Sequence, residues 1–496
     1  MGRQLLCHVK RNERNLKVAI IGAGWSGLAA AVHATWAGHI ATVFEASHAI
    51  GGRARALNGL KKCTLPNGTL ALLDNGQHIL IGAYADTLRL MRQVGVNPDE
   101  ALLSLPMTLM FPDGLGLTFK SWPTPLDALG GILSARGWSI TDKASLLRAA
   151  LGWQLKGFTC AADLSVAQLC HGLTPKVTAE LIEPLCVSAL NTPAGRASAH
   201  VFLRVLRDAL FGIQGGSRLL LPRVDLSALF PDAAAVWLQQ HGGHVRLGQR
   251  VQSLQIQGKA QEDRQEGLQE NRQGNLQGKQ PAVGWLVDGE AFDAVILATS
   301  ASNAALALMK SAQVATESIA IQMQQWAAMC QALAFEHIAT VYAWAANARL
   351  AQPMLALRHN GPPAVQSPAP RSVPLPAPCL TPSPAQFVFD RGQLGGPQGL
   401  LAFVVSAAEG DRATLEAQVL AQAQAQLGLT LQAVQTVFEK RATFACTPGL
   451  QRPQTLIAPG LLACGDYVAG PYPATLEGAV RSGMAAANAL PSRHTT

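Results

Sequence analysis

Residues 17–53 have the sequence KVAIIGAGWSGLAAAVHATWAGHIATVFEASHAIGGR, in which an apolar run continues directly into three spaced glycines. Residues 18–21 have the length and β-branched character of a buried strand. Gly22, Gly24 and Gly27 follow a pattern in which the first glycine permits a tight turn and the second lets the backbone approach a pyrophosphate. The third lets a helix pack against the strand. This stretch therefore predicts a strand–turn–helix unit that binds a dinucleotide.

The helix and the second strand that follow complete this unit. We expect a helix over residues 26–36, and its first turn, which includes Ser26, would direct unpaired N–H groups and a positive dipole end at a diphosphate. A strand over residues 41–44 ends at Glu45, where a carboxylate can accept hydrogen bonds from ribose hydroxyls. Glycines at this spacing alone are weak evidence, but the strand, the helix and the acid all agree with dinucleotide binding.

A glycine pair and an arginine, Gly51, Gly52 and Arg53, follow Glu45 closely. Backbone amides at a glycine pair can approach a second phosphate, and a guanidinium can pair with phosphate oxygens. By itself this triplet is better explained as a surface turn with a solvated arginine. Its position resembles the extended fingerprint of the FAD-containing amine oxidase and carotenoid desaturase superfamily, in which this arginine lies over the cofactor. NAD-binding domains usually lack it.

A second cofactor signal lies near the C-terminus. A buried strand over residues 461–464 leads to Gly465 and Asp466, whose carboxylate can bond the ribityl chain or the diphosphate of a flavin. A helix that begins near residue 474, with Thr475 and Leu476 at its start, offers amides to the electron-rich pyrimidine edge of a flavin. Alone, this segment is also consistent with one more βα unit. Because a flavin must be held at both ends, the two signals together predict FAD in preference to NAD.

A polar cluster formed by Asp74, Asn75, Gly76, Gln77 and His78 lies between apolar runs, close in sequence to the dinucleotide unit. Gln77 and His78 are candidates to face the redox ring of the cofactor. The alternative is that Asp74 and Asn75 form an Asx turn and that His78 is a hydrogen-bonded histidine of the core. Both interpretations are open at this point.

The chain is long and more apolar than most soluble chains. With 496 residues it can contain two or more domains with ample cores. Hydrophobic residues make up 49% and charged residues only 14%, an excess that a large apolar cavity or a membrane-facing patch would explain. The net charge of +8 comes from scattered residues without basic runs interleaved with aromatics, so we expect no nucleic-acid partner. Contact with an anionic membrane surface is still open.

The cysteines and the N-terminal residues indicate the cellular compartment in which the protein is expected. Nine dispersed cysteines without a CxxC pair predict free thiols in a reducing cytosol and no metal site. Residues 1–16 are basic but lack the apolar core of a signal peptide, so we expect a flexible N-terminal segment. The apolar stretch 18–37 contains the motif glycines and an internal turn, which argues against a membrane span. We therefore predict a cytoplasmic protein without a transmembrane helix.

The central part of the chain predicts further elements with fewer chemical signals. A hairpin is expected over residues 111–119, and residues 219–223 precede a helix that Asp225 or Ser227 caps and that runs to about residue 240. Residues 244–251 alternate like a strand. Apolar helices, which either line a substrate cavity or form ordinary core, are expected over residues 83–94, 141–155, 165–171, 175–183 and 197–210.

Two segments are expected to lack regular structure. Residues 258–280 are glutamine-rich, charged and nearly free of apolar side chains, which predicts a disordered insert. Many prolines between residues 360 and 384 predict an irregular loop. Strands and a helix are expected elsewhere in the second half, over residues 292–299, 387–390 and 400–406 for the strands and 411–427 for the helix.

Several motifs together resemble the hydroxysqualene dehydroxylase family, the squalene-associated FAD-dependent desaturases of bacterial hopanoid biosynthesis. The resemblance covers most of the chain from residue 17 to about residue 490, apart from the glutamine-rich insert and the proline-rich loop. The motifs that carry it are residues 74–78, residues 191–193 with 197–199, residues 216–218 with 222–223, and residues 473–483.

The resemblance implies an α/β protein with two domains. One is a Rossmann-like FAD-binding domain that contains the βαβ unit with its GxGxxG motif, and the other is a discontinuous α+β substrate-binding domain. The implied contacts to FAD include the backbone of Val251 on the adenine side. The FAD-binding domain would comprise residues 17–105, 213–300 and 440–492, and the substrate-binding domain residues 106–212 and 301–439.

The resemblance also implies a reaction, the reductive removal of an allylic hydroxyl group from hydroxysqualene to give squalene, with reduced FAD as the hydride donor. His78 is the candidate proton donor for the leaving hydroxyl group. A long apolar isoprenoid substrate agrees with the apolar composition, and peripheral contact with a membrane or with upstream squalene-pathway enzymes would follow. The alternatives are an oxidative carotenoid desaturase of the phytoene type, and a flavin-bound partner in a lipid-synthesis assembly that has no turnover of its own.

Overall fold

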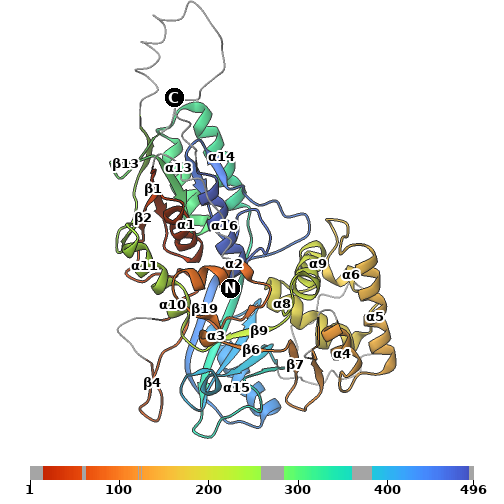
Figure 1. The fold of residues 1–496 in the computed structure, drawn as a ribbon. Helices are drawn as coiled ribbons and strands as arrows, with labels where there is room; N and C mark the ends of the chain where they lie inside the picture. Colours follow the sequence, from red (N-terminus) through yellow and green to blue (C-terminus); the bar gives the residue numbers. More distant parts are fainter. Residues whose placement is uncertain are drawn as a thin grey trace, which may run out of the picture.

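The structure is a computed structural model that describes residues 15–57, 63–120, 122–123, 126–257, 284–359 and 382–490. The predicted disordered insert, most of the predicted proline-rich loop and nearly all of the predicted flexible N-terminal segment lie outside the described residues. Figure 1 shows an upper region around α1 (Trp25–Trp36) and α16 (Leu476–Asn488) and a lower region around β19 (Gln432–Phe444) and α15 (Arg412–Leu427). It also shows a helical region that contains α5 (Ile140–Leu155) and α6 (Val166–Leu169).

A six-stranded sheet forms the centre of the upper region. Its inner strands are apolar and almost completely buried, as expected for parallel strands that helices cover on both faces, whereas the edge strand over residues 244–246 is partly exposed. Only β20 runs antiparallel to its neighbour. The strand order is β10 (His244–Arg246), β2 (Ile40–Phe44), β1 (Lys17–Ile21), β14 (Ala294–Leu297), β21 (Leu461–Ala463) and β20 (Leu456–Ala458). The predicted Rossmann-like α/β fold is thus confirmed.

Helix α1 (Trp25–Trp36) packs in close contact with α16 (Leu476–Asn488). A Cβ atom on Gly483 of α16 would lie 2.2 Å from the Ser26 carbonyl oxygen, so only glycine permits this close crossing. The predicted helices over residues 26–36 and near residue 474 are confirmed within two residues. The crossing brings the N-terminal and C-terminal motifs of the chain together, as the ribbon also shows (Figure 1).

The helix predicted between residues 225 and 240 is two helices, α10 (Leu226–Leu229) and α11 (Pro231–Gln240). Asp225 is the cap, because its carboxylate accepts hydrogen bonds from the first amides of α10. The break falls at Phe230, whose φ of −156° and ψ of −51° are not helical. A residue before proline is disfavoured from the helical conformation, so Pro231 ends one helix and begins the next.

The strand predicted over residues 244–251 is shorter than expected and ends at Arg246. Its partner β2 ends at Phe44, and Gly248, with a φ of +68°, turns the chain away from the sheet. The Gln249 N–H group still donates to the Glu45 carbonyl oxygen at 2.9 Å. This segment therefore stays beside the end of β2 without extending the sheet.

The lower region contains a five-stranded antiparallel sheet. Its strand order is β16 (Met354–Ala356), β17 (Phe387–Asp390), β18 (Leu400–Ser406), β15 (Phe335–Trp344) and β19 (Gln432–Phe444). Helix α15 (Arg412–Leu427) packs against β19 and β15. The predicted strands over residues 387–390 and 400–406 and the predicted helix over residues 411–427 are confirmed, whereas the two longest strands, β15 and β19, were not predicted.

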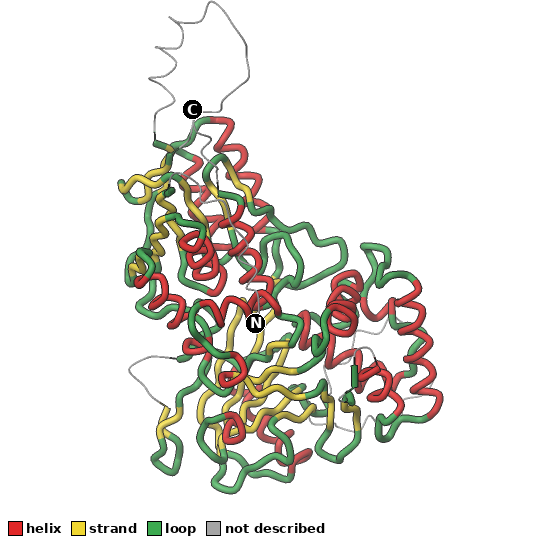
Figure 2. The backbone as a smooth tube through the Cα atoms, in the orientation of Figure 1, coloured by secondary structure: helices red, strands yellow, loops and turns green. Residues whose placement is uncertain are grey.

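A small sheet links the upper and lower regions, and a helical region extends from it (Figure 2). The small sheet has the order β5 (Leu80–Ile81), β9 (Leu219–Pro222) and β6 (Leu102–Leu105). The predicted hairpin is confirmed as β7 (Thr108–Met110) and β8 (Gly116–Thr118). The predicted helices are present as α2 (Ala85–Gln93), α5 (Ile140–Leu155), α6 (Val166–Leu169), α7 (Pro175–Val177) and α9 (Ala199–Arg207), with short π-helical turns after α7 and α9. Helices α4 (Leu126–Leu133) and α8 (Glu183–Leu190) were not predicted.

Two further helices, α13 (Ala301–Ala312) and α14 (Glu317–Gln331), lie beside the six-stranded sheet (Figure 1). Trp326 of α14 donates from its indole nitrogen to the Gln454 carbonyl oxygen at 2.8 Å, just before β20. The boundaries predicted for the two domains stay a prediction. In the described ranges, no helix has the length and apolar character needed to cross a membrane.

Candidate cofactor site

The three glycines after β1 have different surroundings. Gly22 has a φ of +115°, and a Cβ atom there would lie 2.6 Å from the Ala298 carbonyl oxygen. A Cβ atom on Gly27 would lie 2.0 Å from the Gly22 carbonyl oxygen, so this glycine holds α1 against the turn. A Cβ atom on Gly24 would meet, among the described atoms within 4 Å, only the Gly52 Cα atom at 3.9 Å. The surface over Gly24 is therefore open, as the close approach of a diphosphate requires.

The N-terminus of α1 has the electrostatic properties of an anion site. Gly24 caps the helix without a side-chain acceptor, and the first turn, which the structure describes in full, contains no acidic residue. Glu45 lies at the end of β2, where its carboxylate accepts from Ala23 N at 2.8 Å and from Ser47 N at 2.9 Å. The buried hydroxyl of Ser26 is hydrogen-bonded to the Cys464 side chain. The uncapped amides of α1 thus fit the negative charge of a dinucleotide.

The second glycine segment lies beside the first. Gly51 pairs with Gly24 as an isolated parallel bridge, and its N–H group donates to the Ala23 carbonyl oxygen at 2.8 Å. Gly52 has a φ of +63°, and a Cβ atom there would lie 3.1 Å from the Gly24 Cα atom. Glycine is needed here because two backbone segments meet without side chains between them.

Arg53 connects the N-terminal and C-terminal motifs. Its Nη2 atom donates to Asp466 Oδ1 at 2.5 Å, and its Nη1 atom donates to the Ala442 carbonyl oxygen of β19. Gly465, beside Asp466, donates its N–H group to Ser482 Oγ of α16 at 3.1 Å. The two cofactor signals that lie more than 400 residues apart in the sequence therefore meet in one place.

The polar cluster over residues 74–78 lies against Arg53 and the lower sheet. Asn75 donates from Nδ2 to the Arg53 carbonyl oxygen at 2.8 Å. Gln77 donates its N–H group to Thr340 Oγ1 of β15 at 3.4 Å, and its Oε1 atom accepts from Arg391 Nη1 at 3.1 Å. Gly76 between them has a φ of +99°. The cluster therefore lies where the upper and lower regions meet.

Asp74 has a structural environment. Its side chain is 2% exposed, accepts from Leu226 N at 2.9 Å, and lies 3.7 Å from Arg391 Nη2. Burial raises the pKa of Asp74 to about 6, although the Leu226 amide and Arg391 oppose the rise. The side chains of Asp74 and Asn75 bond to distant segments, and this replaces the Asx turn that was the alternative interpretation.

His78 is half-buried, and its Nδ1 atom lies 3.1 Å from the Gly76 carbonyl oxygen. Because a carbonyl oxygen can only accept, Nδ1 carries the hydrogen atom and the Nε2 atom of the neutral ring is an acceptor. Burial and the nearby charge of Arg53 lower the pKa of His78 below 6.5, although the Gly76 hydrogen bond opposes this. His78 can therefore donate a proton from Nε2 only after it has taken one up. Its catalytic role stays a prediction.

The N-terminus of α16 is held by a strained turn. Tyr472 and Ala474 have φ values of +56° and +60°, which residues other than glycine rarely adopt. Thr475 caps the helix, since its Oγ1 atom accepts from Gly478 N at 3.0 Å and donates to the Tyr472 carbonyl oxygen at 2.7 Å. Leu476, the first residue of α16, therefore has a fixed position at the start of the helix.

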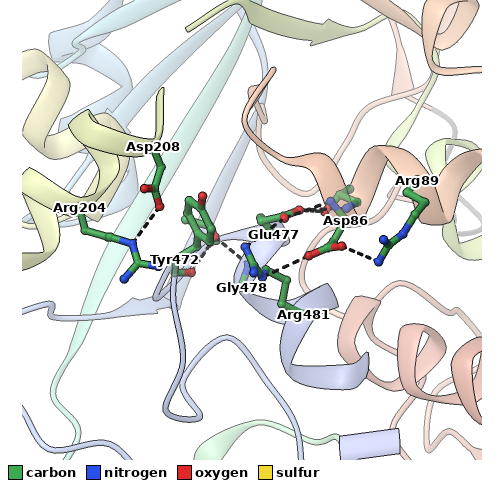
Figure 3. Close-up of polar contacts among 10 residues, drawn as sticks. Asp86, Arg89, Arg204, Asp208, Tyr472, Glu477, Gly478 and Arg481 are labelled. Carbon is green, nitrogen blue, oxygen red and sulfur yellow. Dashed lines mark hydrogen bonds and ion pairs between the residues drawn. The ribbon is translucent and has the colours of Figure 1, made fainter. Parts of the chain in front are cut away.

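A buried carboxylate fixes the first turn of α16 to α2 (Figure 3). Glu477 is fully buried and accepts from Thr87 N at 2.9 Å, from Thr87 Oγ1 at 2.7 Å and from Asp86 N at 3.2 Å. Burial raises the pKa of Glu477, and these hydrogen bonds oppose the rise. Arg481, one turn further along α16, lies 3.2 Å from the Asp86 carboxylate.

Most of the predicted site residues are thus brought together around Gly24, Arg53 and Asp466. Val251 is half-buried, and Gln249, two residues earlier, donates its N–H group to the Glu45 carbonyl oxygen. Sequence reasoning missed three residues of the lower region, Thr340, Arg391 and Glu439. Only Arg391 had a local signal, since it directly follows the predicted strand over residues 387–390.

Comparison with known proteins identifies relatives with the same fold. Residues 25–491 match the family model described as flavin containing amine oxidoreductase. A solved oxidoreductase from Methanosarcina mazei has a TM-score of 0.61 and 16% identity, and the alignment covers 95% of this chain and 99% of that one. At this identity, the likeness concerns the fold.

Curated relatives include two named hydroxysqualene dehydroxylase. The protein from Zymomonas mobilis is 28% identical over 256 residues, which are 48% of this chain and 55% of that protein. The protein from Sinorhizobium fredii is 29% identical over 249 residues, which are 48% of this chain and 54% of that protein. The chain thus aligns with about half the length of these relatives.

Proposed function

Because the chain belongs to the flavin-containing amine oxidoreductase family and has FAD as its cofactor, we propose that it removes the hydroxyl group of hydroxysqualene to give squalene. The observation that carries this proposal is the alignment with the two dehydroxylases named above. The arrangement of the candidate site supports it, since residues 74–78, one of the motifs that resemble that family, lie against Arg53.

We propose the following residues as those that would hold FAD. Gly24 and the amides of α1 would bind the diphosphate, Glu45 the adenosine ribose, and the Val251 backbone the adenine side. Gly52, Arg53 and Asp466 would bind the diphosphate or the ribityl chain. The remaining predicted contacts, from the turn and helix start that face the ring system, are Asn75, Gly76, Gln77, Thr475 and Leu476.

In the overall reaction a C–O bond of the substrate breaks, a C–H bond forms, and the hydroxyl group leaves as water. FAD, when bound and reduced, supplies the hydride. The protein must then protonate the leaving hydroxyl group and exclude bulk water from an allylic cation. His78 is the proposed donor, and its lowered pKa makes the protonated form a strong acid relative to an ordinary histidine.

The proposal is tested with the purified flavoprotein and two substrates. Under reducing conditions without oxygen, hydroxysqualene should be converted to squalene, identified in the extracted lipid by mass spectrometry. Under oxidising conditions with a quinone acceptor, phytoene should remain unchanged. New double bonds in phytoene would instead establish the carotenoid desaturase, and bound flavin with neither conversion would favour the non-catalytic partner.

A further inference from the structure

Helix α5 has apolar side chains on two opposite sides. It buries Leu146 and Trp153, yet Ile140, Leu151 and Leu155 are 87%, 56% and 80% exposed. These exposed residues are spaced eleven and four positions apart and therefore lie along one face of the helix. Exposed apolar side chains gathered on one helix face mark an interaction surface. Figure 1 shows α5 at the outer edge of the helical region, away from α1 and α16.

The neighbouring helix α4 continues this pattern. Leu126, Leu129 and Leu133 are exposed and have the i, i+3, i+7 spacing of a single helix face. Trp122, just before α4, is 55% exposed, and its ring lies over Gly130 of the same helix. An exposed tryptophan among leucines is the combination that membrane interfaces favour.

Within residues 120–160, the exposed charged side chains have one sign. The only carboxylates in the sequence from residue 120 to residue 160 are Asp127 and Asp142, which are 6% and 7% exposed. Asp127 accepts from Ser217 Oγ at 3.0 Å, and Asp142 accepts from Ser139 N at 2.8 Å in the capping box of α5. The cations of the same segment, most of them exposed, are Lys120, Arg136, Lys143, Arg148 and Lys156.

A cavity of about 420 Å³ lies behind α5. Apolar side chains including Trp153, Leu169 and Leu173 line it, together with Arg148 and Lys156. Its described lining contains no carboxylate. Apolar and cationic groups therefore occur together both on the outer face of α5 and in the hollow beside it.

We propose that the α4–α5 surface, defined by Trp122, Leu126, Leu129, Leu133, Ile140, Leu151 and Leu155 with the five cations, docks on an anionic phospholipid bilayer. The apolar side chains enter the boundary between headgroups and acyl chains, and each cation near the surface contributes about 1 kcal/mol. A second copy of the chain is a poor occupant, because two such surfaces would bring like charges together. The proposal is independent of the reaction.

The test is flotation of the holoenzyme with vesicles. Wild type should float with vesicles that contain phosphatidylglycerol, much less with pure phosphatidylcholine, and less as salt is raised. Combined Leu151→Glu and Leu155→Glu substitutions should weaken binding at least about tenfold, because they place charges in the apolar boundary. Arg148→Gln with Lys156→Gln should weaken it about fivefold per cation.

The matched control is Leu306→Glu on α13, since Leu306 is 72% exposed but lies outside the α4–α5 surface. It should bind vesicles like wild type. Each variant is compared only if its flavin content and melting temperature equal those of wild type. The proposal is overturned if wild type ignores phosphatidylglycerol vesicles at low salt, if Leu306→Glu loses binding equally, or if the protein binds only an acidic polypeptide such as polyglutamate.

Discussion

Replacing Gly24 with alanine separates cofactor binding from folding. Gly24 has a φ of −74°, which alanine also adopts, and the added Cβ atom would make an ordinary contact of 3.9 Å with Gly52. Alanine is a poorer N-terminal helix cap than glycine by about 1 kcal/mol. Alanine also lowers the conformational entropy of the unfolded chain, which offsets about 0.4–1 kcal/mol of this loss. The free energy of unfolding of the apoprotein should therefore stay within about 1 kcal/mol of wild type.

The same methyl group would occupy the open surface over Gly24. Hydrogen bonds to a charged group contribute about 1.5–3 kcal/mol, so loss of an amide–phosphate contact should weaken FAD binding roughly 10- to 150-fold. Gly27→Ala is the contrasting variant, because its Cβ atom would lie 2.0 Å from the Gly22 carbonyl oxygen and α1 would have to move. We expect Gly27→Ala to be strongly destabilised even without cofactor.

Both quantities are measured on apoprotein. Chemical denaturation gives the free energy of unfolding, and fluorescence titration with FAD gives the dissociation constant. A Gly24→Ala protein that binds FAD as tightly as wild type would refute the placement of the diphosphate over Gly24. A Gly24→Ala protein that unfolds as readily as Gly27→Ala would refute the inference that the surface over Gly24 is open.

Three further substitutions test the surrounding residues. Wild-type turnover should rise as pH falls through the lowered pKa of His78. The His78→Gln substitution should flatten this pH profile, whereas the control substitution His200→Gln, at an exposed histidine, should leave the profile unchanged. Glu477→Gln should destabilise the protein by about 1–3 kcal/mol in chemical denaturation, because a buried acceptor is lost, and the exposed Glu409→Gln should have no effect. Burial raises the pKa of Asp74 from 3.8 to about 6. The protonated side chain therefore makes its full contribution to the stability of the folded protein below pH 3.8, and this contribution is lost as pH rises through 6. Asp74→Asn should remove up to about 3 kcal/mol of this pH dependence in denaturation midpoints, and an unchanged dependence would contradict the assignment.

The parts of the fold that were predicted correctly have local causes. Strand β1, α1 and β2 follow one another within residues 17–45, and their apolar runs, glycines and caps act over a few residues. The break at Phe230 also has a local cause, since Pro231 follows it. This break was not predicted, because the apolar periodicity of residues 225–240 continues across it and indicates a single helix.

The parts that were missed depend on distant partners. Strand β19 contains charged residues, including Glu439 and Lys440, and it becomes a strand by pairing with β15, about one hundred residues earlier. Thr340 and Glu439 reach the polar cluster because these two paired strands lie against it. Arg391 bonds to Gln77 from more than 300 residues away. The position of Arg391 after a predicted strand is a local signal, but no local pattern indicates which distant residue it contacts.

The central claim is tested most directly by a single turnover without oxygen. The flavin of the purified protein is chemically reduced, and the amount of reduced flavin is measured. Excess reductant is then removed, and hydroxysqualene is added. We predict one squalene formed for each reduced flavin, together with return of the oxidised flavin absorbance. Hydroxysqualene recovered unchanged beside flavin that stays reduced would contradict the proposed dehydroxylase.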